Sequence, residues 1–161
     1  MTIIREFAPA KLNLYLNITG RQANGYHDLD SIVGFSSIGD EVALRAGKGF
    51  QFEITGPMAA ALENEPKETN LAVKAAMSLA ELTGNKLDVT MVLVKNLPVA
   101  SGIGGGSADA AASLRALAKF WGMDPNDPRI MQAAVKHGQD VGVCMRTENC
   151  YMTATGVIPA P

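Results

Sequence analysis

The sequence predicts an α+β fold, because segments with a strand pattern precede segments with a helix pattern. Residues 10–19 (AKLNLYLNIT) alternate apolar and polar side chains, which is the period of a half-buried strand. From residue 70 onward, stretches rich in alanine and leucine follow helix-capping residues. The length of 161 residues favours one domain, and the hydrophobic fraction of 47% is typical of a globular protein.

The first half of the chain contains four predicted strands. They cover residues 10–19, 31–35, 41–46 and 50–55, and a Gly-Lys-Gly turn joins the last two. The apolar face of the first strand, which a half-buried strand turns toward the core, consists of Leu12, Leu14, Leu16 and Ile18. Residues 56–68 (GPMAAALENEPKE) are polar and rich in helix breakers, so we expect a connection there.

The second half contains three predicted helices and one further strand. Asn70 is a good N-cap for a helix that ends at Gly84. Residues 87–98 are rich in β-branched residues and predict a strand closed by a proline. Further helices are expected over residues 107–121 and 127–137, and the tail from residue 140 is interpreted as short strands and turns.

Composition excludes several classes of partner. The formal net charge of −2 gives no basic field for nucleic acid, and aromatic residues at 6% are too few for a base-stacking platform. No stretch approaches the ~20 apolar residues of a membrane span, and the N-terminus lacks the pattern of a signal peptide. Cys144 and Cys150 do not have a zinc-site spacing, so we expect free, structural thiols in a reducing cytoplasm, with a local disulfide as the alternative. The oligomeric state stays open.

Four glycines in five residues (102–106) lead directly into an alanine-rich helix. A helix N-terminus has free N–H groups and a dipole that favours negative charge, and glycines let the backbone approach a phosphate closely. The hydroxyl of Ser107 can cap the helix, contact a phosphate or ligate Mg²⁺. The segment is neither a P-loop, since no lysine follows the last glycine, nor a dinucleotide fingerprint, since Asp109 stands where that motif needs glycine.

The string LPVASGIGGGSADAAA (residues 97–112) resembles the second motif of the GHMP kinases, with Ile103 and Ala108 as mild departures. The resemblance implies the N-terminal domain of that superfamily over residues 1–161. Its fold is a ribosomal-protein-like α/β sandwich, with a mixed sheet and helices packed on it. ATP and Mg²⁺ are the implied cofactors, with Ser107 as the metal ligand. The implied contacts to ATP in this segment are Pro98, Ala100, Gly102, Gly104, Gly105, Gly106 and Ser107.

Four more segments resemble one branch of the superfamily: APAKLNLYLNI, RQANGYHDLDSI, ETNLAVKAAM and KHGQDVGVCM. That branch phosphorylates the 2-hydroxyl of a cytidine-diphosphate-linked methylerythritol in the non-mevalonate route to isoprenoid precursors. The resemblance implies that Asp140 is the general base and that Lys11 pairs with it and stabilises charge. It further implies substrate contacts for Asn13, Tyr26 and His27, and nucleotide contacts for Asn70 and Lys95.

Each of these residues also has a purely structural interpretation. Lys11 and Lys95 could be solvated strand-end charges, Asp140 a turn residue and Asn70 only an N-cap. Gly142 stands where the family usually has proline, and the family enzymes are about twice as long, with a second domain. Two other functions therefore stay open: another GHMP kinase, of homoserine or mevalonate type, which would lack the Tyr26-His27 pair, or a non-catalytic nucleotide-binding fragment.

Overall fold

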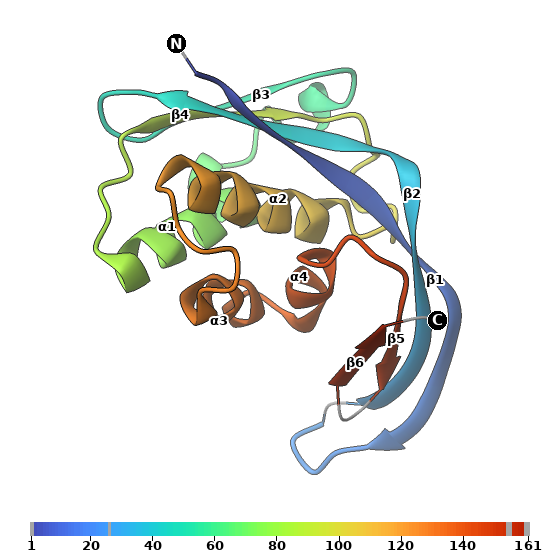
Figure 1. Ribbon diagram of the computed structural model, residues 1–161. Helices are drawn as coiled ribbons and strands as arrows, with labels where there is room; N and C mark the ends of the chain where they lie inside the picture. Colours follow the sequence, from blue (N-terminus) through green and yellow to red (C-terminus); the bar gives the residue numbers. More distant parts are fainter. Residues whose placement is uncertain (1, 26, 154–155, 160–161) are drawn as a thin grey trace.

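The computed structural model describes residues 2–25, 27–153 and 156–159. Two long antiparallel strands, β1 (Ile4–Arg21) and β2 (His27–Ala46), form the curved spine of the molecule (Figure 1). The remaining strands are β3 (Gln51–Thr55), β4 (Val89–Val94), β5 (Cys150–Thr153) and β6 (Gly156–Pro159). The sheet order is β3-β4-β2-β5-β6, with β1 also paired to β2. Since β3 runs parallel to β4 and the other pairs are antiparallel, the predicted mixed sheet is confirmed.

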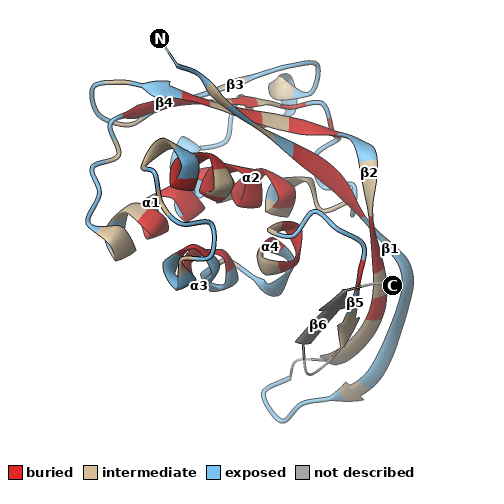
Figure 2. Ribbon diagram, in the orientation of Figure 1, coloured by how far each residue is buried: buried red, intermediate tan, exposed pale blue. Residues whose placement is uncertain are grey.

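The helices gather on one face of this sheet (Figure 1). They are α1 (Leu71–Thr83), α2 (Gly105–Phe120), α3 (Pro128–Lys136) and the short α4 (Gln139–Cys144), preceded by two 3₁₀ turns, Ala59–Leu62 and Lys67–Thr69. Helix α2 is the central one and is buried along most of its length (Figure 2). Its many alanines allow the sheet and the other helices to approach closely, so the α+β core is built around it.

The three predicted helices are confirmed to within two residues, and residues 31–35 and 41–46 do lie in strand, but their division into two separate strands is wrong. Residues 31–35 and 41–46 are parts of one continuous strand, β2, with an irregular register where β1 pairing passes from Pro9 to Lys11. Gly39 makes this possible, because an added Cβ would lie 2.2 Å from the carbonyl oxygen of Ala8. The tail from residue 140 contains helix α4 before its strands, since the packing of Val141 and Cys144 into the core stabilises a short helix.

The outer half of β1 does not bury the face that its alternation predicts. Leu12, Leu14, Leu16 and Ile18 are all exposed, and Leu14 and Ile18 are 67% and 60% accessible. Beyond the helix layer, β1 and β2 continue as an antiparallel ribbon, so this part of β1 has no helix to pack against (Figure 2). Only the inner stretch from Ala8 to Lys11 is buried in β1, and Ala8 and Ala10 are its apolar members in the core.

Both cysteines are free thiols and buried, as predicted for structural residues. Burial raises the pKa of Cys144 to about 12, so this thiol stays protonated and unreactive near neutral pH. Within the described part of the chain, no helix combines the length and the apolar character needed to cross a bilayer.

Candidate active site

The glycine segment forms an open anion cradle at the start of α2. Gly102 and Gly104 have φ values of +75° and +65°, which glycine adopts without the steric cost that a Cβ brings. The N-cap is Gly104, and no side chain caps the helix, so the first N–H groups of α2 remain available to a ligand. An added Cβ at Gly106 would meet no atom within 4 Å, which places open space directly in front of this first turn.

A cavity of about 350 Å³ lies in front of the cradle. Its walls come from the N-terminus of α1, the end of β4, the glycine segment and the first turn of α2. All nine residues expected to contact ATP line this one cavity: Asn70, Lys95, Pro98, Ala100, Gly102, Gly104, Gly105, Gly106 and Ser107. Residues far apart in sequence thus converge on a site whose donors and shape fit a phosphate group.

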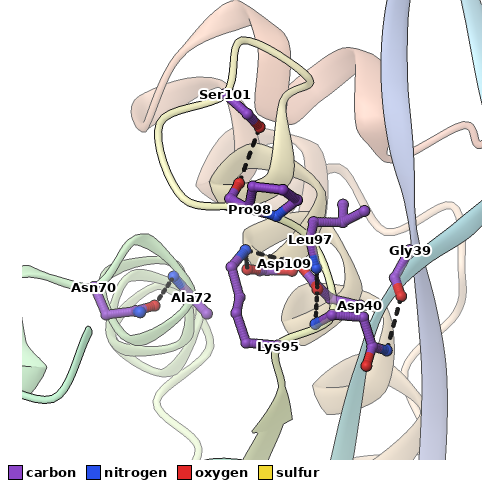
Figure 3. A network of polar contacts seen from close by, with 10 residues as sticks. Gly39, Asp40, Asn70, Ala72, Lys95, Leu97, Pro98, Ser101 and Asp109 are labelled. Atoms are coloured by element: carbon purple, nitrogen blue, oxygen red, sulfur yellow. Dashed lines mark hydrogen bonds and ion pairs between the residues drawn. The ribbon is translucent and has the colours of Figure 1, made fainter. Parts of the chain in front are cut away.

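A buried charge network lies under the cradle and was not predicted (Figure 3). The Lys95 ammonium donates to Asp40 Oδ2 at 2.7 Å and to Asp109 Oδ2 at 2.9 Å. Asp40 Oδ1 accepts from the backbone N–H groups of residues 96 and 97, at 2.6 and 2.8 Å. The network therefore joins β2, the end of β4 and the first turns of α2, and it fixes the position at which the glycine segment begins.

The charges of this network are set by burial. Desolvation opposes the charge of Lys95, but the carboxylates of Asp109 and Asp40 outweigh it and raise the Lys95 pKa. Desolvation, helped by a hydrogen bond with Asp40, raises the pKa of Asp109 well above its usual range. Asp40 accepts hydrogen bonds from two backbone N–H groups as well as from the ammonium.

Lys95→Met is expected to lower the free energy of unfolding by about 3–5 kcal/mol, because it leaves buried carboxylates without their cation. Chemical denaturation of both proteins measures this difference. Arg5→Met is the control, since it breaks an ion pair (Arg5 to Glu41, 2.6 Å) whose side chains are exposed and whose loss costs below about 1 kcal/mol. Equal losses in the two variants would show that the network does not stabilise the fold.

A second polar group lies beside the cradle. The Lys11 ammonium donates to Asp140 Oδ1 at 3.1 Å and approaches Asn13 Oδ1 at 3.5 Å. The Lys11 side chain is 4% accessible, whereas that of Asp140 is 53% accessible. The carboxylate therefore faces solvent, while the lysine side chain is buried. Ser31 donates to the same Asn13 oxygen at 3.3 Å, which orients the amide.

The Lys11–Asp140 pair and the cradle are joined through the backbone. The Lys11 N–H donates to the carbonyl oxygen of Ile103 at 2.8 Å. An added Cβ at Gly104 would lie 3.0 Å from Lys11 Cβ and Cε, so glycine is needed for this close approach. Arg115 of α2 donates to the carbonyl oxygens of Cys144 and Phe7 at 3.0 and 2.8 Å, and these two hydrogen bonds connect the end of α4 to β1.

Asn70 has the capping role that its position predicts. Its Oδ1 accepts from the Ala72 N–H at 3.0 Å at the start of α1 (Figure 3). The same residue lines the cavity, where its amide nitrogen is the polar group left for a ligand.

The two roles of Asn70 are separable by mutation. Asn70→Ala is expected to cost about 1 kcal/mol of stability through loss of the cap, whereas Asn70→Asp keeps the cap and the stability. Nucleotide binding is expected to weaken several-fold in both variants, because both remove the amide donor. Denaturation and Mg·ADP titration measure the two effects, and unaltered binding in Asn70→Asp would leave this residue with the capping role alone.

Two predicted substrate contacts cannot be placed. Tyr26 lies outside the described residues, and His27 is described only as the first backbone position of β2. Asp40 and Asp109, in contrast, are positioned at the site but were missed by sequence reasoning. The one available signal was an aspartate, Asp109, inside a run of alanines on a buried helix, where an acidic side chain is rare unless it is paired.

Comparison with known proteins agrees with this geometry. Residues 70–148 match the model of the GHMP kinases N terminal domain family. A crystal structure of homoserine kinase from Cytophaga hutchinsonii superposes with a TM-score of 0.70 at 23% identity, covering 100% of this chain and 52% of that one, which shows a shared fold. The chain therefore has the fold of the GHMP kinase N-terminal domain.

Within this class, the sequence is similar to one kind of enzyme. It is 46% identical over 153 residues to 4-diphosphocytidyl-2-C-methyl-D-erythritol kinase of Parvibaculum lavamentivorans, covering 95% of this chain and 52% of the relative. A crystal structure of 4-(cytidine 5'-diphospho)-2C-methyl-D-erythritol kinase matches with a TM-score of 0.80 at 29% identity, covering 98% of this chain and 55% of that one. The chain spans about half the length of the curated relatives it matches.

Proposed function

We propose that this chain supplies the ATP-binding and general-base part of a 4-diphosphocytidyl-2-C-methyl-D-erythritol kinase, acting in the cytoplasm on the non-mevalonate route to isoprenoid precursors. The observation that carries the proposal is the Lys11–Asp140 pair at 3.1 Å, held beside a phosphate cradle by the Lys11–Ile103 backbone hydrogen bond. Phosphoryl transfer depends on positioning and charge stabilisation more than on covalent chemistry, and this arrangement offers both.

In the proposed reaction, the groups that bind phosphate and the group that binds Mg²⁺ are different parts of the site. The first N–H groups of α2 bind phosphate oxygens, and the helix dipole adds about 0.3–1 kcal/mol for each. The Ser107 hydroxyl would be one ligand of Mg²⁺, which usually completes its shell with phosphate oxygens and water. ATP supplies the phosphoryl group, and Mg²⁺ neutralises the charge of its phosphates.

Asp140 has the geometry of a general base. Its carboxylate is accessible to a substrate hydroxyl, and one of its oxygens is oriented by Lys11. In the proposed step Asp140 accepts the proton of the 2-hydroxyl, and Lys11 stabilises the negative charge that develops on that oxygen. Asn13, oriented by Ser31 and adjacent to the pair, donates its amide N–H to the substrate.

The test is the release of ADP by the 161-residue chain, given Mg·ATP and 4-diphosphocytidyl-2-C-methyl-D-erythritol. Turnover with this substrate, and none with homoserine or mevalonate, is the expected result. Preference for homoserine or mevalonate would assign another GHMP activity. Nucleotide binding without any turnover would limit the present chain to binding, and the kinase activity would then have to be sought in a longer form of the protein.

A further inference from the structure

A second cavity, of about 650 Å³, lies away from the phosphate cradle. It is bounded by β3, by the outward side of α1 and by the C-terminal end of α3. None of its lining residues also lines the cradle cavity, so the two are separate. Nothing in the proposed kinase reaction uses this cavity.

The floor of the second cavity is apolar. Phe52 and Val73 in its lining are buried, Phe50 is half-buried, and the residue Met77 is 55% accessible. A hollow of this size with aromatic and aliphatic walls gains free energy by taking up an apolar group and releasing water. The flexible Met77 can adapt to the shape of such a group.

The rim of the second cavity carries cations. Lys67, Lys74 and Lys136 stand around it, against two carboxylates, Glu53 and Glu68. The Lys67 ammonium is engaged with the Phe52 carbonyl oxygen at 2.7 Å. Among the ion pairs of the described residues, none involves Lys74 or Lys136. Two exposed lysines thus remain available at the mouth of an apolar hollow.

His137 lines the same cavity as Lys74 and Lys136, and both lysines affect its pKa. Its Nε2 lies 2.8 Å from the Ser78 hydroxyl at the edge of the cavity. Burial, and then the positive charges of Lys136 and Lys74, lower the pKa of this imidazole. Lys74 of α1 and Lys136 of α3 line the same cavity as His137, and an anion at its rim would meet two cations that have no ion-pair partner among the described residues.

We propose that the second cavity binds a small molecule with an apolar body and a phosphate head group. The apolar body occupies the hollow over Phe52 and Val73, and the phosphate lies between the ammonium groups of Lys74 and Lys136. Lysine ammonium groups act as compact point charges toward phosphate, and charge complementarity selects an anion over a neutral molecule of the same shape. This site goes beyond the proposed kinase function and does not depend on it.

Octyl phosphate is the probe for the first experiment, used below its micelle concentration with 1-octanol and inorganic phosphate as comparisons. The chain has two histidines, so the imidazole signal of His137 is assigned in an NMR spectrum by the variant His137→Gln. We expect octyl phosphate to shift the His137 signal and the Met77 methyl signal saturably, with a dissociation constant at least about tenfold below those of octanol and phosphate. Equal affinity for octanol and octyl phosphate would overturn the proposal.

The double variant Lys74→Met/Lys136→Met tests the head-group contact. Each exposed charge contributes modestly, so the affinity for octyl phosphate is expected to fall by about threefold to tenfold. The matched control is Lys48→Met/Lys86→Met, which removes two exposed lysines away from the cavity lining and is expected to leave the affinity unchanged. Unchanged affinity in the first variant, or shifts at Gly106 that saturate before those at His137, would contradict the assignment. Because no turnover is measured, failure here leaves the kinase proposal intact.

Discussion

Asp140→Asn is expected to lower the rate of phosphoryl transfer by about 10²–10⁴-fold, because asparagine cannot accept the proton of the attacking hydroxyl. Binding of Mg·ATP is expected to be unchanged, since Asp140 does not line the cradle cavity. ADP release measures the rate, in the 161-residue chain or in a longer form that contains it, and calorimetric titration measures the binding. Asparagine keeps the size of the side chain, so the variant tests the proton acceptor and not the packing of α4.

The matched control for this variant is Asp124→Asn, which changes an exposed aspartate between α2 and α3. It is expected to leave turnover and binding as they are. A full rate in Asp140→Asn would show that this carboxylate is not the base. Loss of nucleotide affinity together with rate would show instead that Asp140 acts on the nucleotide site.

Gly106→Val is expected to raise the dissociation constant of Mg·ADP by at least about a hundredfold, because its side chain enters the open space in front of the first turn of α2. The fold is expected to tolerate the change, since the added Cβ meets no atom within 4 Å. Titration calorimetry measures the affinity, and thermal unfolding checks the stability. Gln132→Val, at an exposed position of α3, controls for adding a β-branched residue to a helix.

Gly105→Val is a less selective test of the same cradle. An added Cβ there would lie 3.1 Å from Lys95 Nζ and 3.8 Å from Asp40 Oδ2, so the side chain presses on the buried charge network. This variant is expected to lose both stability and nucleotide binding. Retained Mg·ADP affinity in Gly106→Val, with the fold intact, would rule out the cradle as the phosphate site.

The sequence predicts the helices of this fold better than its strands. Helices α1, α2 and α3 have local end signals, such as Asn70, Gly84 and Asp127, and these signals act without help from distant residues. The outer half of β1 alternates like a half-buried strand, but its burial depends on whether another layer covers it, and alternation carries no information about that. Helix α4 was missed because six residues with an internal glycine become helical only through packing.

In the site, too, features with a local sequence signal could be predicted, and features that arise only from packing could not. The glycine segment is recognisable because its conformation requires glycine, whereas the roles proposed for Lys11 and Asp140 could be predicted only from the resemblance of their motifs. Asp40 was missed because nothing near it in sequence identifies its partners. Its role arises only where β2, the end of β4 and α2 meet, and the second cavity arises in the same way from α1, α3 and β3.

The backbone hydrogen bond from Lys11 to Ile103 has a consequence for thermal motion. This peptide N–H, at 2.8 Å from its acceptor, couples the backbone of the cradle to the backbone that carries the lysine side chain. In the proposed reaction the attacking hydroxyl and the phosphoryl group would be held by parts whose displacements are correlated, so the distance between hydroxyl oxygen and phosphorus would vary less than either position does. Catalysis loses rate steeply with small errors in that separation, and this correlation would keep the reacting groups aligned.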